Sequence, residues 1–168
     1  MKIRRAFAED AADLAKLFER AYSTSMAPAY EEAAFAAALP FLTRSNPELL
    51  GSGTYYVVEL EEPGTILGAG GWTRECPGTK EITSGLAHLR HFATDPCIAR
   101  QGVGRRIFRE CARDAEKAGA GLFQAFSSLN AVAFYEGLGL VVVRRMDLQF
   151  SPSVSLPAIL MQGPVSMG

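Results

Sequence analysis

Residues 92–105 read Phe-Ala-Thr-Asp-Pro-Cys-Ile-Ala-Arg-Gln-Gly-Val-Gly-Arg, and they decide how the rest of the chain is interpreted. An apolar strand ends at Pro96, and a short turn then brings two glycines to the start of an amphipathic helix. Glycines let an anion approach the backbone, and the free N–H groups of a helix N-terminus point toward it. Cations are unfavourable at this end of a helix dipole, yet arginines gather here: Arg100, Arg105, Arg106 and Arg109. The stretch therefore predicts a binding site for a phosphate-bearing ligand.

The glycine turn matches neither of the two common nucleotide-binding motifs. The dinucleotide fingerprint requires a third glycine at the position of Ile107, and no acidic ribose partner follows about 20 residues downstream. The chain contains no Gly-Lys-Ser or Gly-Lys-Thr of a Walker motif. A tight strand-to-helix turn that only needs small residues would also explain Gly102 and Gly104. The glycines alone therefore do not distinguish a phosphate site from such a turn.

A second feature is the stretch 127–140, which reads Ser-Ser-Leu-Asn-Ala-Val-Ala-Phe-Tyr-Glu-Gly-Leu-Gly-Leu and follows a predicted strand. Together the two stretches resemble the two hallmarks of the GNAT superfamily of N-acetyltransferases. These hallmarks are a glycine turn that opens a helix and a short helix of the form Ala-x-x-Phe-Tyr-x-x-x-Gly. The resemblance covers Gly85 to Leu140. It departs from the family pattern at Ala99, which occupies the first Arg/Gln position of the glycine motif, with Arg100 next to it.

The resemblance implies an α/β fold in a single domain, residues 1–168. The expected sheet is mixed but mostly antiparallel, has six to seven strands flanked by about four helices, and is splayed at the cofactor site. The implied reaction is the transfer of an acetyl group from acetyl-CoA to a primary amine of a small molecule or peptide. In this family the C-terminal strands would pair across a homodimer.

The resemblance also assigns residues to acetyl-CoA. The pyrophosphate would lie on the backbone amides of the turn, and the pantetheine arm would pair with an open strand edge. A backbone N–H near Ala93 would polarise the thioester carbonyl. The family's asparagine position corresponds to Ser128, with Asn130 two residues later. The expected cofactor-binding residues are Phe92, Ala93, Thr94, Arg100, Gln101, Gly102, Val103, Gly104, Arg105, Ser128 and Asn130.

Two catalytic residues are expected, Tyr135 and His88. A phenol with an ordinary pKa of about 10 can donate a proton to a thiolate whose thiol pKa is about 8.5, so Tyr135 is the expected general acid. From the sequence alone, Tyr135 and Phe134 would also serve as an aromatic pair that packs a short helix.

His88 occupies a position where the family often has a strand carboxylate, and it is the expected general base. Two alternatives stay open: Glu75 is the base, or His88 is a packed or solvent-facing residue without a catalytic role. His88 and His91 are three residues apart on a strand and face opposite sides unless a bulge intervenes, which excludes a shared metal.

The acceptor pocket is expected opposite the cofactor, between the 22–40 segment and the hairpin strands. Its candidate lining residues are Tyr22, Met26, Tyr30, Phe35 and Trp72. Two other function classes stay open. One is an acyl-CoA-binding sensor that has lost catalysis, which the departure at Ala99 favours, and the other is an anion- or nucleotide-binding module without CoA.

Composition narrows the remaining classes. The hydrophobic share of 48%, the charged share of 21% and the net charge of −1 are typical of a globular protein and argue against broad capture of nucleic acid or anionic lipid. Three cysteines without C-x-x-C spacing favour a reducing compartment over disulfides or zinc. The N-terminus lacks a signal-peptide pattern, and no apolar run is long enough to span a membrane. We therefore expect a cytoplasmic protein with no metal, no nucleic acid partner and no membrane association.

Hydrophobic periodicity predicts the order strand, two helices, three strands, helix, strand, helix and two strands. The expected helices cover 9–22, 31–39, 102–119 and 131–138, and Pro40 is expected to end the second of them. Asn46-Pro47 would start another short turn or helix, and 62–65 would form a hairpin turn. The expected strands cover 2–6, 54–61, 66–74, 85–94, 122–126, 140–150 and 156–161.

Overall fold

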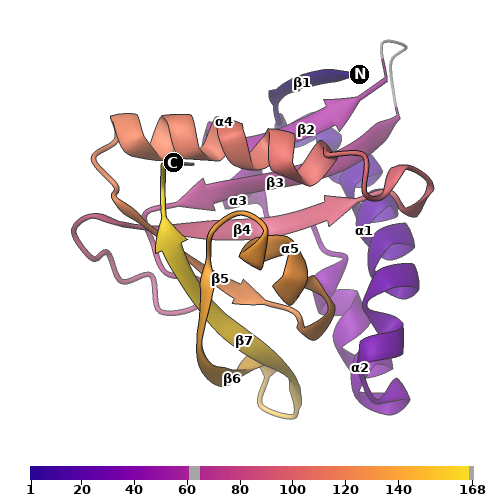
Figure 1. The fold of residues 1–168 in the computed structure, drawn as a ribbon. Coiled ribbons are helices and arrows are strands. Elements are labelled where there is room, and N and C mark those ends of the chain that lie inside the picture. Colours follow the sequence, from indigo (N-terminus) through magenta and orange to yellow (C-terminus); the bar gives the residue numbers. More distant parts are fainter. Residues whose placement is uncertain (61–64, 167–168) are drawn as a thin grey trace.

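A mixed seven-stranded sheet forms the centre of the structure, a computed structural model that describes residues 1–60 and 65–166 (Figure 1). The chain begins with β1 (Lys2–Arg5), α1 (Ala11–Ser25), α2 (Glu32–Leu42) and α3 (Pro47–Leu50). It continues through β2 (Tyr55–Glu59), β3 (Ile66–Thr73), β4 (Leu86–Thr94) and α4 (Val103–Lys117). It ends with β5 (Leu122–Ser127), α5 (Val132–Glu136), β6 (Val141–Ser151) and β7 (Val154–Pro164).

The strand order is β1-β2-β3-β4-β5-β7-β6, and within the described residues only β4 and β5 pair in parallel. This confirms the predicted mixed and mostly antiparallel sheet. Five α-helices accompany the sheet in the described ranges, one more than the four expected. The additional helix is the short α3, which Asn46 caps through its side-chain oxygen. The predicted turn at 62–65 lies almost entirely outside the described residues.

The helices cover the two faces of the sheet and create two apolar cores (Figure 1). On one face α4 buries Ile107, Phe108 and Cys111 against the central strands. On the other face α1 buries Leu14 and Phe18 together with side chains of α2 and the strands. The spacing of three and four residues in both helices produces these buried stripes. The sheet is therefore covered on both sides, and its central strands are largely apolar.

Pro40 does not end the second helix, and α2 instead runs on to Leu42. A proline in the last turn removes one backbone N–H bond, but it leaves the following bonds intact. The backbone N–H and the hydroxyl of Thr43 both donate to the carbonyl of Leu39, each at 3.0 Å, and close the end of the helix. The prediction of a helix end at Pro40 was therefore wrong by a few residues.

The sheet splits between β4 and β5. The two strands pair only over Leu86–His88 on β4 and Leu122–Gln124 on β5, although β4 continues to Thr94 and β5 to Ser127. Beyond His88 the described part of β4 has no strand partner on this side. This confirms the predicted splay, and it leaves a strand edge open at the centre of the molecule.

A β-bulge in β4 changes the direction of the side chains near this open edge. Ala69 pairs with Ala93 but Gly71 pairs with Arg90, so two residues of β4 stand opposite one residue of β3. His91 lies within the bulge and adopts the left-handed region, with φ of 50°. The tyrosine hydroxyls of α1 and β2 stabilise the bulge, since Tyr22 donates to the Phe92 carbonyl at 3.1 Å and Tyr55 donates to the His91 carbonyl at 2.7 Å.

The bulge places His88 and His91 on the same face of the sheet. Ala87 and Leu89 belong to the core under α4, so strand alternation turns His88 to the opposite face. His91 stacks on Phe18 of α1, which covers that same face, with ring centroids 3.8 Å apart. The expectation that the two histidines face opposite sides was conditional on a regular strand, and the bulge overturns it.

Candidate active site

A cavity of about 250 Å³ occupies the split between β4 and β5. Its walls come from α1, from the bulged end of β4, from β5 and from the helix α5 that follows β5. The lining is mostly apolar and aromatic, with a few polar groups, as in most small-ligand pockets. The residues that line it are Tyr22, Met26, Leu42, Leu89, His91, Phe92, Ala93, Thr94, Gly104, Phe126, Ser128, Ala131, Phe134, Tyr135 and Leu148.

Tyr135 of α5 is the distinctive polar residue of this cavity. The hydroxyls of the other tyrosines, at positions 22, 30, 55 and 56, each donate to a protein acceptor, whereas the Tyr135 hydroxyl has no partner among the described residues. The Tyr135 hydroxyl is also not fully buried. Among the described residues, the side-chain polar atom that is both fully buried and without a partner is Trp72 Nε1. Burial raises the pKa of Tyr135 well above its ordinary value, and Cys111 raises that pKa further. The phenol is thus protonated at neutral pH and free to donate.

The N-terminus of α4 forms a second cavity of about 200 Å³ beside the first. Gly102 precedes the helix with φ of 81° and provides no side-chain cap, and the first intrahelical bond runs from the Arg106 N–H to the Gly102 carbonyl at 3.0 Å. The N–H groups of Val103, Gly104 and Arg105 therefore lack intrahelical acceptors. Arg100 also adopts the left-handed region, with φ of 65°. Uncapped amides beside left-handed residues create a concave site for an anion.

The two cavities are contiguous, because Thr94, Gly104 and Phe134 line both of them. The Phe134 ring lies so close to Gly104 that a Cβ atom added there would be 2.7 Å from the ring. Arg105 donates from Nη2 to the carbonyl of Gly137 at 2.8 Å and joins α4 to the end of α5. The two sequence stretches that suggested the function thus meet at one place in the fold.

The open edge of β4 offers a backbone amide to this site. The Asp95 N–H donates to the Leu67 carbonyl of β3 at 2.8 Å, and antiparallel alternation then turns the Ala93 amide toward β3 as well. The same alternation turns the amide of Thr94, which lies between these two residues, toward the open edge. The structure therefore places a free N–H group next to Ala93, while the Ala93 amide itself belongs to the sheet.

The predicted cofactor residues take different places around the two cavities. Phe92, Ala93, Thr94, Gly104 and Ser128 line the larger one, and Arg100, Gly102, Val103 and Arg105 line the smaller one together with Thr94 and Gly104. Gln101 is exposed in the turn. Asn130 is exposed and is not among the described residues that line either cavity.

His91, rather than His88, lines the larger cavity among the described histidines. His88 is buried beside Phe126, with ring centroids 6.5 Å apart, and Phe126 lines that cavity whereas His88 does not. Burial lowers the pKa of His88, and the charge of Arg90 lowers that pKa further. Burial lowers the pKa of His91 to about 4, although its ring nitrogen Nε2 is 3.0 Å from the carbonyl of Leu42. Both rings are therefore neutral at pH 7.

The neutral His91 ring predicts a stability that depends on pH. An unfolded histidine has an ordinary pKa of about 6.5, so the unfolded chain binds more protons between pH 6.5 and 4, and the free energy of unfolding falls as the pH decreases through this range. We expect His91→Gln to reduce the loss between pH 7 and 4.5 by about 2 kcal/mol, measured by urea denaturation. An unchanged pH dependence in the variant would show that His91 is not the group responsible.

The predicted acceptor wall is only partly present in the larger cavity. Tyr22 and Met26 line it, whereas Phe35 belongs to the core under α1 and α2. Tyr30 instead connects segments around the site: its hydroxyl donates to the Pro157 carbonyl and accepts from the Leu129 N–H, both at 2.9 Å. Trp72 and Glu75 border a different cavity, beside α3.

Several lining residues were not predicted from the sequence. Leu42, Phe126 and Leu148 come from α2, β5 and β6, and nothing in their local sequence distinguishes them from ordinary core residues. Phe134 is different, because it precedes Tyr135 in the aromatic pair that the sequence already singled out. Its position over Gly104 could not be inferred without the packing of α5 on α4.

Two further properties complete the site. Among residues 1–60 and 65–166, no group of three or more His, Cys, Asp or Glu side chains is arranged to hold a metal ion. Of the helices in these ranges, none combines the length and the apolar character needed to cross a bilayer.

Comparison with known proteins supports the architecture of this site. The chain is similar in structure to the PaiA N-acetyltransferase of Thermoplasma acidophilum in complex with coenzyme A, with a TM-score of 0.70 and 16% identity over 97% of this chain and 98% of that one. It is also similar to a GCN5-related N-acetyltransferase of Rhodopseudomonas palustris, with a TM-score of 0.72 and 19% identity over 97% and 94% of the two chains. The ribosomal-protein-S18-alanine N-acetyltransferase of Escherichia coli gives a TM-score of 0.61 and 20% identity over 99% and 95%. At these identities the structural matches show the fold alone.

The sequence comparison identifies the family. No curated protein sequence matches the chain. The family model for the acetyltransferase (GNAT) domain matches residues 26–149, which include the bulged β4, the uncapped helix α4 and Tyr135. This match covers most of the chain, so the protein belongs to the GNAT family of acetyltransferases.

Proposed function

We propose that this protein transfers the acetyl group of acetyl-CoA to a primary amine of a small molecule or peptide, and that Tyr135 is the general acid. The observation that carries the proposal is the unpartnered Tyr135 hydroxyl in a cavity that is contiguous with the uncapped N-terminus of α4. One end of this space offers donors for a phosphate group, and the other offers a proton for a leaving sulfur. Residues 1–168 would act as one catalytic domain, because a single sheet contains both the first strand and the last strand of the chain.

Acetyl-CoA would be the acetyl-donor substrate. Its pyrophosphate would accept hydrogen bonds from the amides of Val103, Gly104 and Arg105, where the helix dipole also favours negative charge. Its pantetheine amides would pair with the open edge of β4 at Phe92 and Thr94. The departure from the family motif at Ala99 removes one possible side-chain donor but leaves these backbone donors in place.

The residues of the cavity suit transfer to an amine. The amine nitrogen forms a bond to the acetyl carbon, the carbon–sulfur bond breaks, and the sulfur leaves as a thiolate that takes up a proton. Tyr135 can supply that proton, because its raised pKa keeps the phenol protonated throughout the range of an assay. A backbone N–H on the open edge would polarise the thioester carbonyl during the same step.

The amine must lose a proton before or during its attack, because an alkyl ammonium has no free electron pair. We propose His88 as the base that receives it. His88 is next to Phe126 but does not line the cavity, so the proton would reach it through a bridging water. A lowered pKa keeps His88 in the neutral form that can accept a proton at pH 7.

The direct test is an assay of CoA-thiol release with acetyl-CoA and a panel of small amines and peptide N-termini. We expect release that depends on one class of amine and that yields the acetylated amine by mass spectrometry. Tight CoA binding without transfer to any amine would instead favour the acyl-CoA sensor. No CoA binding at all would exclude both functions.

Two further proposals concern the oligomeric state and the location of the protein. The edge strand β6 exposes Val141, Val142 and Val143, so we propose that two copies form a homodimer through this edge, to be tested by light scattering. The three cysteines remain free thiols, which is compatible with the proposed cytoplasmic location.

A further inference from the structure

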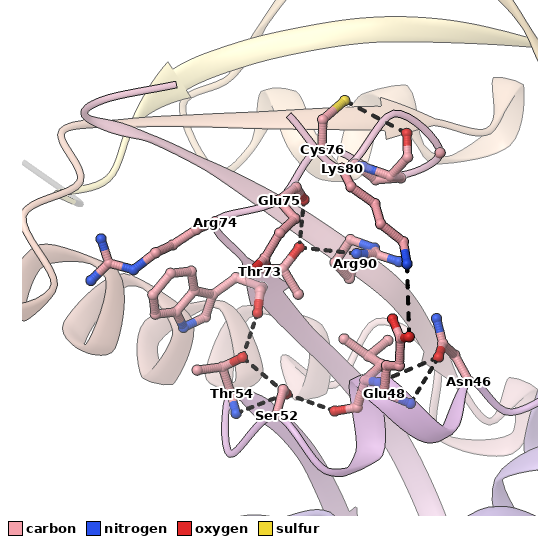
Figure 2. Close-up of a pocket in the computed structure, with 14 residues that line it drawn as sticks. Asn46, Glu48, Ser52, Thr54, Thr73, Arg74, Glu75, Cys76, Lys80 and Arg90 are labelled. Carbon is pink, nitrogen blue, oxygen red and sulfur yellow. Dashed lines mark hydrogen bonds and ion pairs between the residues drawn. The ribbon is translucent and has the colours of Figure 1, made fainter. Parts of the chain in front are cut away.

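A further cavity of about 640 Å³ lies outside the proposed acyl-transfer site (Figure 2). It is bounded by α3, by the start of β2, by the end of β3 with the 74–80 loop, and by Arg90 of β4. It shares no lining residue with the two cavities around Tyr135 and α4. A volume of this size is typical of a site for a small organic molecule.

Arg90 is the residue that gives this cavity its chemistry. Its guanidinium donates from Nη1 to the Thr73 hydroxyl at 2.9 Å, and it has no carboxylate within salt-bridge distance among the described residues. Arginine has five N–H donors arranged in a planar fork, and most of them are unused here. Burial lowers the pKa of Arg90, and neighbouring Cys76, Glu75 and Glu48 offset this only in part. A partly buried cation with unused donors is costly unless a ligand supplies an anion.

The surroundings of Arg90 favour a carboxylate over a phosphate dianion. Figure 2 shows Arg90 between Thr73 on one side and the Lys80–Glu48 pair on the other. The described lining contains three cations, Arg74, Lys80 and Arg90, and two carboxylates, Glu48 and Glu75, so a ligand with a single negative charge balances it. A carboxylate has one charge, and its two oxygens match the fork of a guanidinium.

We propose that this cavity is a second ligand site, which binds a small carboxylate-bearing molecule through Arg90. Asn46 also lines the cavity, and its side-chain NH2 group can donate to the polar parts of such a molecule, since its oxygen already caps α3. The hydroxyls of Ser52 and Thr54 line the cavity too, but they already donate to the carbonyls of Leu49 and Trp72. Arg90 and His91 are adjacent in sequence but line different cavities, so the β4 bulge separates the two sites.

The intrinsic fluorescence of the protein can be used to measure ligand binding at this site. Trp72 is the only tryptophan, and it lines the cavity, so its fluorescence should report occupancy. We expect the monocarboxylates propionate and butyrate to change this fluorescence in a saturable way, and the neutral analogue propionamide to leave it unchanged. Saturating CoA should not alter the affinity for propionate, because the two sites share no lining residue.

Three variants test the role of Arg90. Arg90→Gln should weaken propionate binding at least about tenfold, because hydrogen bonds to a charged group are lost. Arg90→Lys should give an intermediate loss, since it keeps the charge but not the fork. Arg74→Gln removes a charge from the exposed rim of the same cavity and should weaken binding less than about threefold.

Several results would overturn the proposal. These are no saturable signal with either carboxylate at tens of millimolar, equal binding of propionamide, tighter binding of inorganic phosphate, or unchanged propionate affinity in Arg90→Gln. Displacement of propionate by CoA would show that the two sites are not separate. Circular dichroism checks that each variant folds. If Arg90→Gln does not fold, Arg90→Lys and the comparison of propionate with propionamide decide the question.

Discussion

Replacing Tyr135 by phenylalanine is expected to lower kcat about 100-fold and to leave the KM for acetyl-CoA nearly unchanged. The phenol has no hydrogen-bond partner among the described residues, so its removal costs no protein contact. In the proposed mechanism the variant loses the transfer of a proton to the leaving sulfur, a step that does not affect donor binding. Steady-state kinetics with the amine found in the panel assay measures both parameters.

The matched control is Tyr56→Phe, the same chemical change at a distance from the cavity. The Tyr56 hydroxyl donates to Asp114 in the region between β2 and α4, and it lines neither cavity of the proposed active site. We expect this variant to keep wild-type kcat. Equal kcat in Tyr135→Phe and the wild type would remove Tyr135 from the reaction and leave the cavity without a known acid.

Gly104→Val is expected to weaken CoA binding at least tenfold, by about 1.4 kcal/mol or more. Any Cβ at this position would be 2.7 Å from the Phe134 ring, so the ring must move, and it lines both cavities. A valine side chain would also occupy the space in which we place the pyrophosphate, and Phe134 is a second obstacle to it. Isothermal titration calorimetry with CoA measures the effect.

A double variant separates these two causes. If displacement of Phe134 is responsible, Gly104→Val with Phe134→Ala should regain part of the affinity relative to Gly104→Val alone. If the valine blocks the phosphate directly, the second change restores nothing. Gly121→Ala is the glycine control, because an added Cβ there meets nothing within 4 Å. Wild-type affinity in Gly104→Val would contradict the placement of the phosphate at α4.

Much of the fold was predictable because the hydrophobic periodicity is strong. The apolar stripe of α4 predicts that helix and its buried face, and the structure confirms both. The strand predicted at 122–126 is present as β5. The two glycine- and aromatic-containing stretches were enough to identify the family, because their chemistry is local in sequence. The position of Tyr135 in a cavity also follows from the second of these stretches.

What the sequence could not provide depends on contacts between distant residues. The bulge at His91 depends on pairing with β3 and on the hydroxyls of Tyr22 and Tyr55, none of which is near it in sequence. It exchanged the expected places of the two histidines relative to the cavity. Arg90 was unremarkable in the sequence for the same reason, because its lack of a carboxylate partner is apparent only when the neighbouring elements are in place.

The left-handed backbone at His91 has an evolutionary consequence. Few residues with a side chain adopt this conformation readily, and asparagine, aspartate and histidine are the usual exceptions besides glycine, whereas β-branched residues are strongly disfavoured. Inherited substitutions at this position should therefore be confined to that small group, even in descendants that have changed their acceptor. A lineage that acquired valine or isoleucine there would have to rebuild the strand, and with it the opening on which acyl transfer depends.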